Sequence, residues 1–136
     1  MLPRYKAIDN ETGVMLRVLS IDLEFDYIIG LPFEEEARDT FGELIIEKRY
    51  YFEDIELLQS TGLFDKNGKE IFEGDIVKHD PVPNQFISNA YFEIIQARSG
   101  EWRMDNYRGG QVLAYSNHEV EVVGNKFEQP HLLGED

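Results

Sequence analysis

Short runs of apolar residues, separated by turn-forming residues, follow one another along most of the chain. The first two runs are residues 5–8 and 14–19, and the polar segment 9–13 between them ends on glycine. Apolar runs bounded by such polar, glycine-containing segments are typical of strands joined by a tight loop. The pattern therefore predicts a hairpin at the start of the chain.

Residues 21–27 alternate strictly between apolar and acidic side chains. A period of two is typical of a strand with one buried and one solvated face. We therefore expect a half-buried strand here, with the carboxylates of Asp22, Glu24 and Asp26 on the solvated face.

The next segment carries signals for one or two short helices. Pro32, followed by three glutamates, suits a first helical turn because acidic side chains stabilise the positive end of the helix dipole. Residues 44–52 form a second strand pattern, with apolar side chains on both faces. Asp54 is a suitable cap for a short helical turn through residue 58.

The strongest local signal is the sequence Lys66-Asn67-Gly68-Lys69. Asn67 and Gly68 both tolerate positive φ, as a type I′ hairpin turn requires. A few residues later Gly74 is expected to adopt a backbone conformation that is unfavourable with a Cβ, and Asp75 to accept hydrogen bonds from backbone amides in a turn.

In the second half of the chain, strand patterns recur at short intervals. They fall at residues 91–97, 102–107, 111–115 and 120–123, after a loop at 81–84 that contains two prolines. Many short strands with turns every 8–12 residues favour a barrel or folded sheet. We predict a mainly β fold, a small pseudobarrel or folded mixed sheet with SH3-like features and one or two short helices. At this length, one domain over residues 1–136 is expected.

The composition of the chain excludes several kinds of site and several classes of binding partner. The 136 residues include no cysteine, which excludes disulfides, thiolate metal sites and cysteine nucleophiles. The net charge of −14 is spread along the chain and repels nucleic acids and anionic membranes. No apolar run is long enough to cross a bilayer, and the first residues lack the apolar core of a signal peptide. We expect a cytoplasmic protein without a membrane partner, and direct nucleic-acid binding is not expected.

Candidate catalytic and metal-binding residues do not form a recognised pattern. Asp22, Glu24 and Asp26 resemble the start of a calcium loop, but Tyr27 and Phe33 stand where an EF-hand needs glycine and glutamate. The three histidines lack zinc-site spacing, and the serines lack a nucleophile-elbow motif. We therefore predict no catalytic residues, no metal and no cofactor, while a small hydrolase remains an alternative.

Residues 102–108 mix aromatic and cationic side chains and form a candidate binding surface. Such a mixture can stack the bases of a single strand. Glu101, Asp105 and the overall charge oppose this, so a strand with ordinary packing is the favoured interpretation. The residues kept as a candidate binding surface are Trp102, Arg103 and Tyr107.

Two stretches resemble the YopX family, which is found mainly in phages and prophages. The first is the run TGLFDKNGKEIFEGDIV at residues 61–77, and the second is EVVGNKFEQPHLL at residues 121–133. The resemblance implies a β-rich pseudobarrel and a phage-related origin, and it carries no catalytic residue. Structural roles are expected for Thr61, Gly62, Leu63, Asn67, Gly68, Gly74, Asp75, Ile76, Val77, Gly124 and Asn125.

The favoured function is a non-catalytic accessory protein that binds an unidentified phage or host protein. Strand edges and apolar patches are expected to make the contact, and the two-faced pattern of residues 44–52 also predicts a homo-oligomer. The alternative from a different class is a nucleic-acid-related protein, either a binder or an acidic mimic of nucleic acid.

Overall fold

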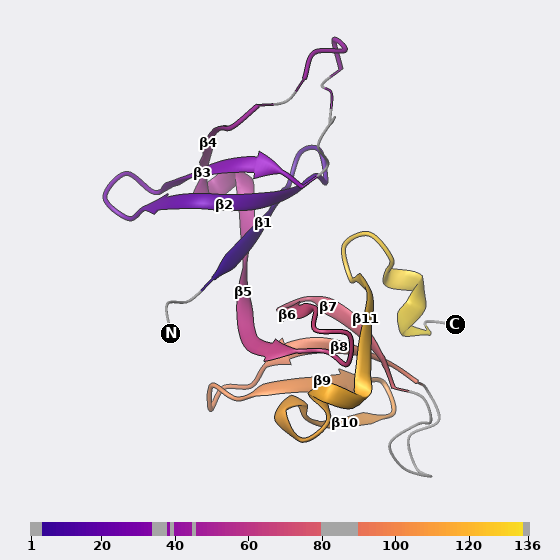
Figure 1. Ribbon diagram of the computed structural model, residues 1–136. Coiled ribbons are helices and arrows are strands. Elements are labelled where there is room, and N and C mark those ends of the chain that lie inside the picture. Colours follow the sequence, from indigo (N-terminus) through magenta and orange to yellow (C-terminus); the bar gives the residue numbers. More distant parts are fainter. Residues whose placement is uncertain (1–3, 34–37, 39, 45, 80–89, 135–136) are drawn as a thin grey trace. The chain divides into compact units, whose positions relative to one another are not determined.

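The protein is mainly β and forms two antiparallel sheets (Figure 1). The structure, a computed structural model, describes residues 4–33, 38, 40–44, 46–79 and 90–134. The strand orders are β4-β3-β2-β1-β5-β6 and β10-β9-β8-β7-β11. Neither sheet closes into a barrel. Among the described residues there is no helix long and apolar enough to cross a membrane.

The strands and short 3₁₀ turns have the following bounds. The first sheet contains β1 (Tyr5–Asp9), β2 (Met15–Asp22), β3 (Tyr27–Pro32), β4 (Lys48–Tyr51), β5 (Ile55–Phe64) and β6 (Glu70–Phe72). The second contains β7 (Asp75–His79), β8 (Tyr91–Gln96), β9 (Trp102–Asn106), β10 (Gly109–Val112) and β11 (Val120–Asn125). The 3₁₀ turns are η1 (Phe52–Asp54), η2 (Leu113–Tyr115), η3 (Asn117–Glu119) and η4 (Pro130–Leu133).

Contacts divide the chain into two compact units, Met1–Gln59 and Ser60–Asp136. Strand β5 supplies residues to both, because its first half pairs with β1 and its second half with β6. The single domain expected over residues 1–136 stays a prediction.

The first unit is built on the predicted β1–β2 hairpin. Gly13 has a φ of 74° and donates its N–H to the carbonyl oxygen of Asp9, which closes the loop. Buried side chains from five strands form the core of this unit, and the ring of Tyr50 lies against the backbone of Gly30. The core residues are Ala7, Leu16, Ile28, Tyr50 and Ile55.

The strand predicted over residues 21–27 is wrong. Strand β2 ends at Asp22, whose carboxylate accepts hydrogen bonds from the N–H groups of Glu24 (2.9 Å) and Phe25 (3.0 Å). This local bonding turns the chain back on itself, and Asp26 completes the turn with a φ of 58°. The apolar–acidic alternation therefore does not produce a strand here, because the Asp22 side chain hydrogen-bonds the backbone that follows it and forms a turn.

The structure tests only part of the predictions for residues 32–58. Residues 34–37, where the first helix was expected, lie outside the described residues. The helical turn expected after Asp54 is wrong, because η1 ends there and β5 begins at Ile55 to pair with β1. The strand expected over 44–52 is present in part, as β4.

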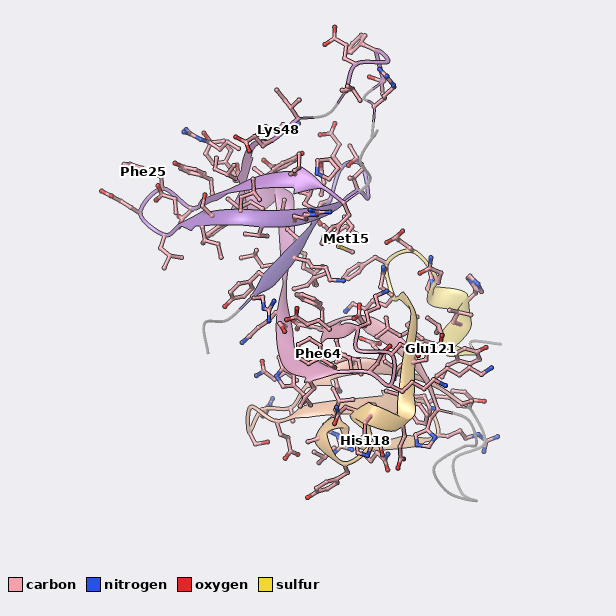
Figure 2. The ribbon with its side chains drawn as sticks, viewed as in Figure 1. Met15, Phe25, Lys48, Phe64, His118 and Glu121 are labelled. Carbon is pink, nitrogen blue, oxygen red and sulfur yellow. The ribbon has the colours of Figure 1, made fainter. Side chains whose placement is uncertain are left out.

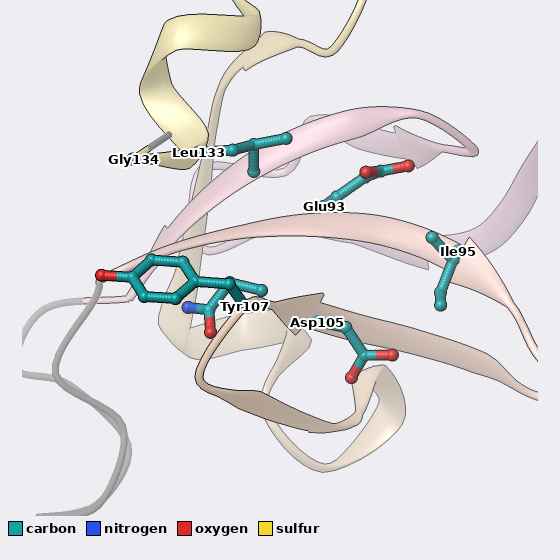
Figure 3. A pocket seen from close by; sticks show the side chains of 7 residues that line it. Glu93, Ile95, Asp105, Tyr107, Leu133 and Gly134 are labelled. Atoms are coloured by element: carbon teal, nitrogen blue, oxygen red, sulfur yellow. The ribbon is translucent and has the colours of Figure 1, made fainter. Parts of the chain in front are cut away.

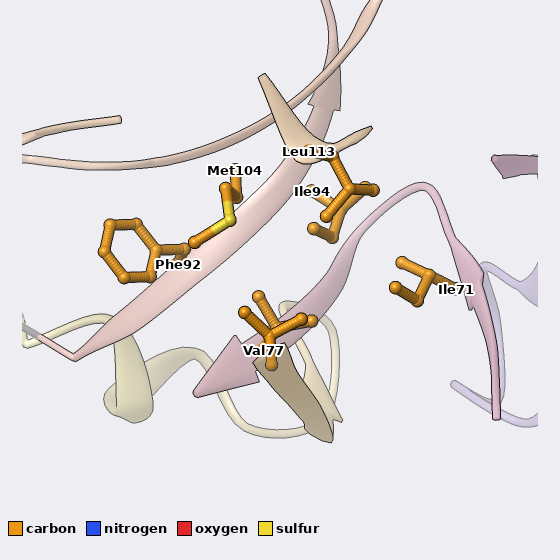
Figure 4. Packing of buried hydrophobic residues seen from close by; sticks show 7 residues of the cluster. Ile71, Val77, Phe92, Ile94, Met104 and Leu113 are labelled. Carbon is orange, nitrogen blue, oxygen red and sulfur yellow. The ribbon is translucent and has the colours of Figure 1, made fainter. Parts of the chain in front are cut away.

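The second unit has a core of fully buried side chains, most of them on the strands β7, β8 and β9 (Figure 4). Trp102 and Leu63 pack against this core from its margin. Its members are Ile71, Val77, Phe92, Ile94, Met104, Leu113 and Val120.

The hairpin predicted around Asn67-Gly68 is present, but its turn type differs from the prediction. Gly68 has a φ of 80°, whereas Asn67 is not in the left-handed region. Asp65 donates its N–H to the carbonyl of Lys69, and Gly68 donates to the carbonyl of Asp65. The loop therefore has three residues, a type I turn followed by a glycine bulge.

Candidate functional site

The residues that carry the family resemblance hold backbone turns of the second unit. The hydroxyl of Thr61 donates to the carbonyl of Ile71 (2.8 Å) and accepts the N–H of Leu63 (3.1 Å). Gly62, between them, has a φ of 76°. The chain thus bends within β5 while its backbone groups stay paired.

Asp65 organises the same region, although the sequence analysis gave it no role. Its carboxylate is 5% exposed and accepts the backbone N–H groups of Asn67, Lys69 and Val122 at 2.8–2.9 Å. Burial alone would raise the pKa of Asp65, but these three hydrogen bonds outweigh it and lower the pKa below its usual value. An aspartate before a turn is a local signal that could have been noticed, whereas its bond to β11 spans 57 residues and could not.

Gly74 and Asp75 behave as predicted at the start of β7. Gly74 has a φ of 84°, and a Cβ there would meet the Phe127 ring at 3.0 Å. The buried carboxylate of Asp75 accepts the N–H of Phe72 at 2.8 Å. The next two residues, Ile76 and Val77, are fully buried.

Asn125 holds the segment that follows β11. Its Oδ1 accepts the N–H groups of Phe127 (3.0 Å) and Glu128 (2.9 Å). Its own N–H donates to the Oε1 of Gln129, and this oxygen would clash with a Cβ at position 124, at 2.5 Å. The carbonyl of Gly74 accepts the N–H of Lys126, so this segment is tied to the start of β7.

The candidate binding residues on β9 do not share one face. Trp102 packs against the core cluster together with Met104, whereas Arg103, between them in sequence, bonds Asp105. Tyr107 follows the strand and is 65% exposed. The structure therefore places Arg103 and Tyr107 apart from Trp102, and a binding role for these residues stays a prediction.

A pocket of about 690 Å³ opens on the second unit (Figure 3). Glu93 on β8 and Asp105 on β9 stand directly opposite each other. Gly110, the partner of Asp105 on β10, leaves room for that carboxylate, because an added Cβ would collide with it. The lining residues are Glu93, Ile95, Asp105, Asn106, Tyr107, Leu133 and Gly134.

The first unit presents a different surface, which we call the hairpin-edge surface and define as Phe25, Tyr27, Arg49, Tyr51 and Phe52. Figure 2 shows Phe25 at the tip of the β2–β3 hairpin. The rings of Tyr27 and Tyr51 meet edge to face at 6.1 Å, and the Arg49 guanidinium lies 4.1 Å from the Tyr27 ring centroid. Phe25, Tyr51 and Phe52 line a groove of about 420 Å³.

Strand β4 is the terminal strand of its sheet, so one of its backbone edges faces away from β3. Phe52 donates its N–H to the carbonyl of Asp26 at 2.9 Å. Hydrogen-bonded and non-bonded pairs alternate along an antiparallel ladder. Since Phe52 bonds the strand opposite, Tyr50, two residues earlier, also directs its backbone N–H and C=O at β3. The N–H and C=O groups of Arg49 and Tyr51, which lie between, point to the open edge of the sheet.

Among the residues that the structure describes, no three His, Asp or Glu side chains are grouped so that they could hold a metal ion. Asp22, the first of the acidic residues at 22–26, bonds its own turn, and the Phe25 N–H in particular lowers the pKa of Asp22. His79 contacts the Glu119 carboxylate at 3.1 Å.

Comparisons with known proteins extend the sequence resemblance to nearly the whole chain. The family model described as YopX protein matches residues 4–134. A solved structure, the crystal structure of protein EF1440 from Enterococcus faecalis, is similar with a TM-score of 0.67 and 29% sequence identity. That similarity covers 98% of this chain and 99% of the other. None of the curated proteins matches the chain.

Proposed function

The chain belongs to the YopX family, and from that premise we propose that it is a non-catalytic interaction module of phage or prophage origin. It acts in the bacterial cytoplasm by binding a phage or host protein. The hairpin-edge surface makes the contact, and the observation that carries the proposal is the juxtaposition there of exposed aromatic side chains with an open strand edge.

Two properties of this surface support binding of a protein. Arginine and aromatic residues are enriched at the energetic centres of protein interfaces. Here Arg49 lies over the ring of Tyr27, and that ring meets the ring of Tyr51 edge to face. Outward-facing N–H and C=O groups on β4 can in addition pair with an extended segment of a partner. Phe25, which is 65% exposed, adds apolar surface at the hairpin tip.

The first unit can also meet a second copy of the chain, through the open edge of β4 and the residues that precede it, and we propose a homo-oligomer as well. Leu44 and Ile46, which precede β4, are both exposed, and Ile46 is 71% exposed. A symmetric dimer needs only one self-complementary patch. Charge repulsion between copies is short-ranged at physiological salt, where the Debye length is about 8 Å.

The test is capture of partners from phage-infected cells with quantitative mass spectrometry. Wild-type protein is compared with the double variant Phe25→Ser/Tyr51→Ser, which removes two exposed rings without touching the core. We expect partners enriched by the wild type to fall about tenfold or more with the double variant, as for loss of interface anchors.

The matched control is Tyr115→Ser, which removes an even more exposed ring from the second unit. It is expected to leave capture unchanged. Identical partner recovery with the wild type and the double variant would contradict the proposed surface.

A further inference from the structure

The pocket on the second sheet combines two carboxylates with apolar walls. Glu93 and Asp105 are cross-strand partners, each with a side chain 27% exposed. Like charges directly opposite each other destabilise a strand pair. Ile95, Leu133 and the ring of Tyr107 supply the remaining surface of the pocket.

The two carboxylates are neutralised unequally. Both oxygens of Asp105 accept hydrogen bonds from Arg103, one from Nε at 3.2 Å and one from Nη2 at 3.1 Å. For Glu93, within the described part of the chain, the charged contact is the Lys126 ammonium, at 3.5 Å from one oxygen. An ionised carboxylate can accept about four hydrogen bonds, so Glu93 keeps most of its capacity for a further donor.

We propose that this pocket binds the guanidinium of an arginine side chain on a partner protein, with Glu93 as the receiving charge. The inference rests on the proposed function as an interaction module, but it concerns a separate surface. A guanidinium forms forked bonds to a carboxylate and stacks on aromatic rings. The pocket offers the ring of Tyr107, and the chain's own Arg108 guanidinium already lies 5.4 Å from the centroid of that ring. The methylene stem of the arginine packs on Ile95 and Leu133.

Charge complementarity selects this occupant. The chain carries a net charge of −14. Arg103, Arg108 and Lys126 contact side chains that line the pocket, but none of the three is itself a lining residue. A volume of about 690 Å³ lies within the usual range of ligand sites and accommodates one arginine side chain with its flanking backbone.

Lys126 acts as an internal competitor in this arrangement. Its ammonium lies 3.5 Å from one Glu93 oxygen, so an incoming cation has to share or replace this contact, and its side chain is 37% exposed and therefore able to move aside. The Lys126 backbone N–H is held separately, by the carbonyl of Gly74. Removing the Lys126 side-chain charge should thus free the site without releasing the segment.

The experiment is a ¹⁵N NMR titration of the full chain with N-acetyl-arginine amide. N-acetyl-citrulline amide, which is nearly isosteric and neutral, is the matched probe. We expect saturable shifts at Glu93, Asp105, Tyr107 and Leu133 with the arginine probe only. Glu93→Gln should weaken binding about tenfold, the usual size of a lost charge-assisted hydrogen bond. Lys126→Met should strengthen it about threefold or more.

The control variant is Glu121→Gln, which makes the same charge change on β11 outside the pocket and should leave the titration unchanged. Absence of saturable shifts at the pocket, equal binding of the citrulline probe, or no gain from Lys126→Met would each overturn the inference. N-acetyl-lysine amide binding as tightly as the arginine probe would overturn the guanidinium preference.

These outcomes are separable from those of the proposed function. The pocket can fail to bind arginine while partner capture still depends on Phe25 and Tyr51. Conversely, the pocket can bind arginine while capture is insensitive to those rings, in which case the interaction surface lies on the second unit.

Discussion

The two units of the chain differ in how firmly carboxylates hold their turns and in how much apolar side-chain surface they expose. In the second unit, the buried carboxylates of Asp65 and Asp75 accept backbone N–H groups and fix the turns. In the first, the buried carboxylate of Asp9 accepts one such N–H, from Glu11. The turn-forming carboxylate of Asp22 is only partly buried, and the hairpin beside it presents Leu23 and Phe25 to solvent.

Large apolar side chains on the surface follow the same division. Eight of the twelve exposed ones among the described residues lie in the first unit. They are Leu19, Leu23, Phe25, Phe33, Phe41, Leu44, Ile46 and Tyr51. The second unit is therefore built as a scaffold, whereas the first leaves contact groups on its surface.

Loss of the Asp65 carboxylate should have the largest effect. Asp65→Ala leaves three backbone N–H groups without their acceptor, each worth about 1–3 kcal/mol when buried, so we expect a loss of about 3 kcal/mol or more. Urea unfolding followed by the fluorescence of Trp102, the single tryptophan, measures it. Asp22→Ala, the partly buried counterpart in the first unit, should have a much smaller effect, and equal losses would remove the contrast between the units.

Gly74→Val should destabilise the fold by about 1–3 kcal/mol. A β-branched residue is strained at a φ of 84°, and its Cβ would also press on the Phe127 ring. Thermal melting compares it with Gly42→Val in the first unit, where the φ is 81° but nothing lies within 4 Å of an added Cβ. If both variants melt together, backbone strain alone explains the cost and the Phe127 contact adds nothing.

Acid should weaken the second unit through Asp65. The folded-state pKa of Asp65 is lowered, so its stabilisation is complete above the unfolded-state pKa of about 3.9 and is lost as the pH falls through the folded value. The free-energy advantage of wild type over Asp65→Asn should therefore be constant from pH 7 to 5 and narrow below about pH 4. An advantage that persists unchanged to pH 2 would show that the carboxylate charge is not what matters.

Self-association should depend on the first unit and leave folding stability nearly unchanged. We expect sedimentation equilibrium at micromolar concentration to give a mass above 15.8 kDa for the wild type. Ile46→Glu/Tyr51→Glu should return the monomer, because each added charge opposes a second copy, while Tyr115→Glu should not. A monomer mass for the wild type across salt concentrations rules the oligomer out.

Sequence patterns predicted the second unit better than the first. Gly74 and Asp75 were assigned correctly because their roles depend on neighbours in the chain. The turn at Asn67-Gly68 was placed correctly, but its type was missed since Asp65 sets the hydrogen bonds. The strand predicted over residues 21–27 was wrong because the alternation of apolar and acidic residues contains no sign of the turn that Asp22 forms.

The candidate surfaces could not be read from the sequence for a different reason. Glu93 and Asp105 meet through the register of β8 and β9, and Leu133 joins them from the far end of the chain. Likewise, Tyr27 and Tyr51 become neighbours only through the β3–β4 register. Spacing along the chain does not encode such registers.

Strand β5 has a consequence for how the chain is made. A ribosome releases β1 to β4 before β5, yet β1 pairs with the first half of β5, with Tyr5 opposite Gln59. During synthesis one edge of β1 therefore stays uncovered until residues 55–59 leave the exit tunnel, and uncovered edges recruit other strands. The same strand then continues into the pairing with β6, whose residues 70–72 leave the tunnel later, so the edge of β1 can be covered before the β5–β6 hairpin forms.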